Sequence, residues 1–158
     1  MASRPVATCR KSLQQHLPNL ERDIEGFKEM LEDLTRGEGK YILPLSWTAK
    51  KMHKRCKTIA EIIYDLECHQ LEEEDDTVAR ELAIEVVRWE DKIKAFLMVI
   101  GKIEEEFKTA QDNFENAQRI KKEREFQAAT RMQHTMREEE AVQGILQHLG
   151  EMTLLGKN

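Results

Sequence analysis

The sequence predicts an all-α fold, and three observations support that prediction. Apolar residues recur with alternating spacings of four and three, a period that keeps one seam on one face of a helix. The 158 residues include only 7 Gly and 3 Pro, so few positions interrupt a helix. Charged residues make up 35% and aromatic residues 6%, which is typical of long helices and coiled coils. We therefore expect one domain over 1–158, an antiparallel bundle of three helices.

The first helix is expected at about residues 13–35. Its apolar seam is Leu13, Leu17, Leu20, Ile24, Phe27, Leu31 and Leu34. Proline lacks an N–H group and clashes with the preceding turn, so the regular part should begin near Pro18 or Asn19. Two glycines and Pro44 then indicate a loop over residues 36–45. Its apolar residues are expected to form a buried strap across the end of the bundle: Tyr41, Ile42, Leu43 and Leu45.

The second helix is expected at about residues 46–71, with Ser46 or Thr48 capping its first turn. Its seam is Met52, Cys56, Ile59, Ile63 and Leu66. Lys50, Lys54 and Lys57 recur at helical spacing on the opposite side, which predicts a basic outer face.

The third helix is expected at about residues 77–137, after an acidic run in which Asp75 or Asp76 caps its free amide groups. The short turn makes helices two and three antiparallel neighbours. The seam of this helix is Leu82, Val86, Trp89, Ile93, Phe96, Ile100, Ile103, Phe107, Ala110, Phe114 and Ala117. Additional apolar residues flank the seam over residues 78–100, which predicts coverage by more than one neighbour. After Gly101 only a narrow stripe persists, as in a coiled-coil arm.

The region after Ala117 admits two arrangements. Either the third helix continues unbroken, or the chain turns near Asn116 and folds back to make a four-helix bundle. The absence of Gly and Pro between Lys102 and Gln143 favours the unbroken helix. A short helical segment is expected at about residues 139–155.

No residue pattern predicts an enzyme, a metal site or a cofactor. His53, Cys56, Cys68 and His69 resemble a metal set only in one dimension, because Cys56 and Cys68 would lie about 18 Å apart along one helix. The sequence holds no nucleophile elbow and no Glu-x-x-His motif of a di-iron bundle.

The leading functional hypothesis is a non-enzymatic assembly or adaptor protein that works by helix-to-helix pairing. A very long third helix would overhang the others, and its apolar stripe there is costly to leave in water. A protein partner is therefore expected on that stripe, either a second copy of the chain or another helical chain. The predicted partner-binding residues are Ile103, Phe107, Ala110, Phe114 and Ala117.

The alternative hypothesis is a peripheral membrane-binding helical protein, either a curved dimer or a bundle that inserts apolar helices into lipid. Its support is two basic clusters that could contact an anionic surface. These are Lys50, Lys54, Lys57, Arg119, Lys121 and Lys122. The net charge of −5 weighs against this alternative and also against a nucleic-acid partner.

The sequence favours a cytoplasmic protein, with the nucleus as a second compartment. Its three cysteines include no CxxC pair, as expected for reduced thiols. The first twenty residues are basic and lack acidic groups, as in a mitochondrial presequence, but Pro5 and Pro18 would interrupt the helix of such a signal. The longest apolar run, residues 95–100, is too short to span a bilayer.

Overall fold

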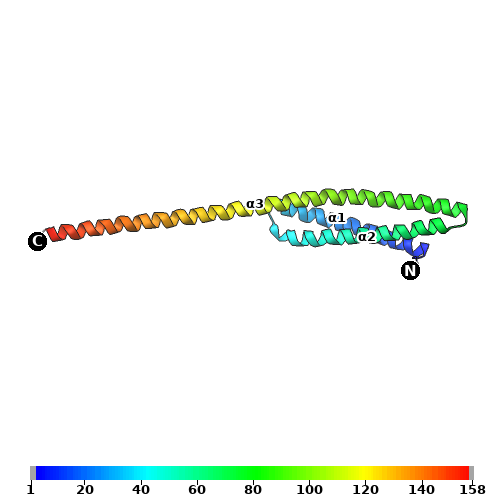
Figure 1. Ribbon diagram of the computed structural model, residues 1–158, viewed down its shortest axis with the longest axis horizontal. Coiled ribbons are helices and arrows are strands. Elements are labelled where there is room, and N and C mark those ends of the chain that lie inside the picture. Colours follow the sequence, from blue (N-terminus) through cyan, green and yellow to red (C-terminus); the bar gives the residue numbers. More distant parts are fainter. Residues whose placement is uncertain (1–2, 157–158) are drawn as a thin grey trace. The chain divides into compact units, whose positions relative to one another are not determined.

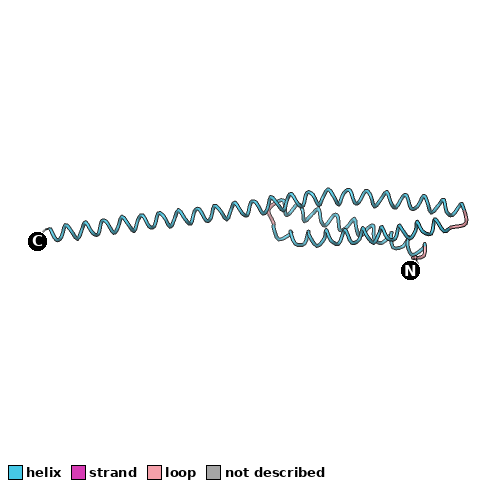
Figure 2. Tube along the Cα trace, in the orientation of Figure 1, coloured by secondary structure: helices cyan, strands magenta, loops and turns pink. Residues whose placement is uncertain are grey.

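The structure, a computed structural model, describes residues 3–156 and their side chains as far as residue 153. Met1 and Ala2, the start of the basic N-terminal segment, lie outside the described residues. Over the described range the chain is all-α and contains no strand, which confirms the predicted class (Figure 2). Its elements are α1 (Val6–Thr35), the short 3-10 helix η1 (Gly39–Tyr41), α2 (Ile42–Glu72) and α3 (Asp76–Gly156), as Figure 1 shows.

The chain divides into two compact units. Unit 1 ends at Phe114, and unit 2 begins at Glu115. Unit 1 contains α1, η1, α2 and the first part of α3, whereas unit 2 is formed by the remainder of α3.

Helix α1 begins at Val6, earlier than the predicted start near residue 13. Cys9, one turn before Leu13, is fully buried and extends the predicted seam. Pro18 lies inside the helix instead of at its start. Proline leaves the carbonyl of residue 14 without its helical donor, and both Pro18 and Gln14 are exposed, so water can replace the missing bond. The predicted end at Thr35 agrees with the structure.

Helix α2 also begins earlier than predicted, at Ile42. Pro44 lies in its first turn, where a missing N–H group breaks no helical bond. The hydroxyls of Ser46 and Thr48 therefore do not cap the helix. They donate to the carbonyl oxygens of Ile42 and Pro44, one turn earlier, at 3.1 and 2.9 Å.

The N-terminus of α3 has the predicted acidic cap. Asp75 Oδ1 accepts hydrogen bonds from the backbone N–H groups of Thr77, at 2.9 Å, and Val78, at 3.3 Å. Asp76 adds a negative charge in the first turn, where the helix dipole favours it.

The core of unit 1 is formed by side chains from α1, α2 and α3. All seven predicted seam residues of α1 and all five of α2 are buried. The contributions of α3 to this core cluster are Val86, Ile93, Ile100 and Ile103, with Trp89, Phe96, Phe107, Ala110 and Phe114 packed against it. The predicted α3 seam is thus confirmed as far as Phe114, whereas Ala117 is exposed.

The apolar residues that flank the α3 seam are not covered in the way that the sequence predicted. Ile84, Val87 and Met98 are all exposed, because their side of α3 faces away from the core formed with α1 and α2.

Unit 2 is helical from Glu115 to Gly156, and every side chain described there is exposed. No turn occurs near Asn116, so the fold-back that would make a fourth helix is absent from the described residues. The separately predicted C-terminal segment is part of α3.

Candidate interaction surfaces

Four of the five predicted partner-binding residues belong to unit 1 and form part of its core or pack against it. Ile103 is buried, and the ring of Phe107 meets that of Phe27 edge to face, with centroids 5.8 Å apart and an interplanar angle of 83°. Ala110 and Phe114 are partly buried against the same core. Their apolar surface is therefore covered by the chain's own helices, and Ala117 alone among the five is exposed.

The ring of Phe114 packs closely on the backbone of Gly39, so a larger residue at position 39 would require the ring to shift. A Cβ atom at Gly39 would lie 2.6 Å from Cε1 of the Phe114 ring, well inside van der Waals contact. The sequence indicated a loop from this glycine, but gave no sign of its aromatic neighbour.

Three groups of contacts between charged or titratable side chains connect the helices of unit 1. Arg10 of α1 donates to both carboxylate oxygens of Glu85 on α3, at 2.8 to 3.1 Å. These hydrogen bonds lower the pKa of Glu85, although partial burial opposes the shift. The other two groups join Asp23 of α1 to Lys51 and Arg55 of α2, and His53 of α2 to Glu104 of α3.

Burial shifts the pKa values of two thiols and one imidazole near the core. Burial raises the pKa of Cys9 and Cys56, which keeps both thiols protonated and unreactive near neutral pH. Burial, followed by the charges of Arg55 and Arg4, lowers the pKa of His16. Among the described residues, no cluster of three or more His, Cys, Asp or Glu is suited to a metal ion.

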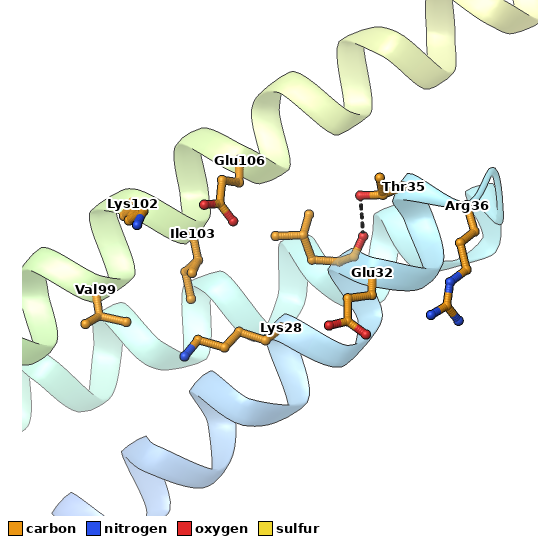
Figure 3. Close-up of a pocket in the computed structure, with 9 residues that line it drawn as sticks. Lys28, Glu32, Thr35, Arg36, Val99, Lys102, Ile103 and Glu106 are labelled. Atoms are coloured by element: carbon orange, nitrogen blue, oxygen red, sulfur yellow. Dashed lines mark hydrogen bonds between the residues drawn. The ribbon is translucent and has the colours of Figure 1, made fainter.

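An open groove of about 590 Å³ lies between α1 and α3 in unit 1 (Figure 3). Its walls are Lys28, Leu31, Glu32, Thr35, Arg36, Val99, Lys102, Ile103 and Glu106. The Thr35 hydroxyl donates to the carbonyl oxygen of Leu31 at 2.8 Å, so it is already bonded. The lysine, arginine and glutamate side chains along the rim carry mixed charges, which select no single class of ligand.

The predicted basic face of α2 is exposed, and it also includes two exposed apolar residues that the pattern of lysines did not predict there. Lys50, Lys54 and Lys57 are exposed, and so are Leu43 and Trp47. Leu43 was expected in a buried strap, but only Leu45 of that strap is fully buried; Tyr41 and Ile42 are partly buried. The spacing in the sequence is consistent with one shared helical face, because the five exposed residues follow one another at intervals of four and three.

Unit 2 presents apolar residues with no cover among the described residues. The largest group, here called the C-terminal stripe, is Val142, Ile145, Leu146, Leu149 and Met152. Each of the five is more than half exposed, and their spacing places them on one side of the helix. Arg119, Lys121 and Lys122 also belong to unit 2 and are exposed.

Comparison with protein families, with curated proteins and with solved structures finds no match to this chain. Over residues 3–156, no helix combines the length and the apolar character that crossing a bilayer requires.

Proposed function

We propose that this protein is a non-enzymatic assembly subunit that binds a helical partner through the C-terminal stripe of unit 2. The observation that carries the proposal is the exposure of five large apolar side chains on one side of a helix. Isolated apolar residues are common on protein surfaces, whereas a contiguous group of this kind marks an interaction site. The spacing of the stripe is the i, i+3, i+4, i+7 pattern by which a helix binds a groove or another helix.

In this proposal unit 1 is an antiparallel three-helix bundle that needs no further chain to complete its seam. Its support is the shared core of α1, α2 and α3 and the ion pairs that connect all three helices. The partner surface accordingly moves from residues 103–117, as the sequence suggested, to residues 142–152. Unit 2 then acts as the coiled-coil segment of the molecule.

The free energy gained by burying the stripe indicates what kind of surface the partner must have. Full burial of a large apolar side chain is worth about 1.5–3 kcal/mol, so five half-exposed residues gain roughly 5 kcal/mol. That gain only matches the lower end of the cost of association, about 4–15 kcal/mol. The partner must therefore contribute an apolar face of its own, as a second copy or a different amphipathic helix would.

The full-length chain with Ile145→Asp and Leu149→Asp tests the proposal. The matched control is Gln143→Asp with Gln147→Asp, which adds the same charges to the other side of the same turns. Light scattering should show a dimer or larger species for the wild type and the control, and a monomer for the stripe variant.

If the wild type is a monomer, the proposed partner is a different chain instead of a second copy. In that case the wild type and the control should co-purify with one helical protein in stoichiometric amount, and the stripe variant should lose it. If the stripe variant retains the same mass and the same partners as the control, the proposed surface is wrong.

A further inference from the structure

The outward face of α2 combines exposed apolar residues with unpaired positive charges. Leu43 and Trp47, one turn apart on this face, are 56% and 60% exposed. Lys50, Lys54 and Lys57 follow on the same side at intervals of three, four and three. This side is opposite the buried seam of α2, so the helix is amphipathic with a basic outer face.

Among the described residues the three lysines of this face belong to no ion pair, and the one exposed carboxylate on the same side is Glu61, one turn after Lys57. Lys51 and Arg55, on its flank, both pair with Asp23 of α1. Within the described part of the chain, by contrast, no ion pair includes Lys50, Lys54 or Lys57. The face therefore carries three lysines outside any described ion pair and one glutamate at its far end, so its part next to the exposed Trp47 is positively charged.

We propose that this face of α2 binds the anionic surface of a phospholipid bilayer, a role beyond the proposed assembly function. Lysine ammonium groups complement lipid phosphate and carboxylate groups. Tryptophan is favoured at the boundary between head groups and acyl chains, where its ring is apolar and its N–H group stays hydrated. Leu43, one turn before Trp47, adds a second side chain that can enter the same layer.

The chemistry of the face favours a lipid bilayer over two other partners, an acidic protein and nucleic acid. An acidic protein would neutralise the lysines but would also need a pocket for Trp47 and Leu43. Nucleic acid would demand a longer basic track than three lysines. The net charge of −5 opposes binding to an anionic surface, so binding has to depend on the local group of lysines on this face.

The test uses the full-length chain and vesicles of phosphatidylcholine with and without phosphatidylserine. The protein should co-sediment with the anionic vesicles at low salt and dissociate as salt increases. Each lysine is worth about fivefold in affinity, so Lys50→Gln with Lys54→Gln and Lys57→Gln should weaken binding on the order of 100-fold. The control is Lys11→Gln with Lys94→Gln and Lys108→Gln, three exposed lysines of α1 and α3, which should bind like the wild type.

Trp47 reports whether the face itself enters the lipid. In a Trp89→Phe background, Trp47 is the only tryptophan, and its emission should shift to the blue with anionic vesicles. Trp47→Ser should weaken binding without changing the circular dichroism spectrum.

Several outcomes would overturn the proposal. These are no co-sedimentation at low salt, equal binding to neutral vesicles, equal loss in the control lysine variant, and an unshifted Trp47 emission. Binding to an acidic polypeptide such as polyglutamate, without binding to vesicles, would assign the face to a protein partner instead.

Discussion

The pair of Phe27 and Phe107 offers the sharpest test of whether residues 103–114 serve unit 1 or a second chain. Phe27 is fully buried, and its ring is in edge-to-face contact with Phe107. Exchanging either phenylalanine for leucine keeps most of the volume and should cost about 1–1.5 kcal/mol of unfolding free energy. An edge-to-face pair adds about 1 kcal/mol beyond its buried area. Phe27→Leu with Phe107→Leu should therefore cost about 1 kcal/mol less than the sum of the single variants.

Urea unfolding followed by tryptophan fluorescence measures this coupling energy. Both tryptophans, Trp47 and Trp89, lie in unit 1, so the signal reports that unit alone. Phe126→Leu, in unit 2, is the control and should leave the transition unchanged, because Phe126 is exposed. Additive single and double variants would refute the contact. A midpoint that depends on protein concentration, with a smaller mass for Phe107→Leu, would instead restore the pairing with a second chain.

Three further predictions follow from the pKa shifts and the cap. Folding lowers the pKa of His16, so the native state has its full stability above the pKa of the unfolded histidine, near 6.5, and loses stability as the pH decreases below it. His16→Gln should reduce the change in the urea midpoint between pH 7 and 5.5. A pH dependence equal to that of the wild type would contradict this prediction. At pH 8, Ellman's reagent should modify Cys68, which is only partly buried, well before Cys9 and Cys56, and simultaneous labelling would be inconsistent with the buried thiols. Asp75→Ala should destabilise unit 1 by about 1 kcal/mol in urea unfolding, whereas Asp75→Ser should retain most of the cap; equal losses would argue against capping.

The sequence predicted helices and seams well, because side-chain period directly determines which face of a helix is apolar. The confirmed α3 seam ends at Phe114, one step before the predicted Ala117. Helix starts were less predictable. Pro18 indicated a helix boundary. It lies on the exposed side of α1, where the carbonyl group of Gln14, which lacks its helical donor, can bond to water. The helix therefore continues through Pro18, with buried residues before and after it.

The candidate surfaces were less accessible to sequence reasoning for a different physical reason. A regular seam indicates that a helix packs, but it is the same whether the neighbour belongs to this chain or to another one. Phe107 and Phe114 satisfied that pattern, and their neighbours are Phe27 and Gly39 of the same chain. The lysines of α2 were correctly expected on an outer face. Leu43 could not be assigned to that face, because the predicted helix begins at about residue 46, after it, whereas α2 begins at Ile42.

The end of the unit 1 core at Phe114 divides α3 into a part with fixed length and a part that can vary. One residue inserted before Phe114 would rotate the following seam residues by 100°, so the aromatic ring would leave Gly39 and the core would lose its register. An insertion after Phe114 displaces none of the packed residues. The sequence beyond this phenylalanine can therefore be lengthened, shortened or exchanged, which would change the proposed partner surface while the packing of residues 6–114 stays the same.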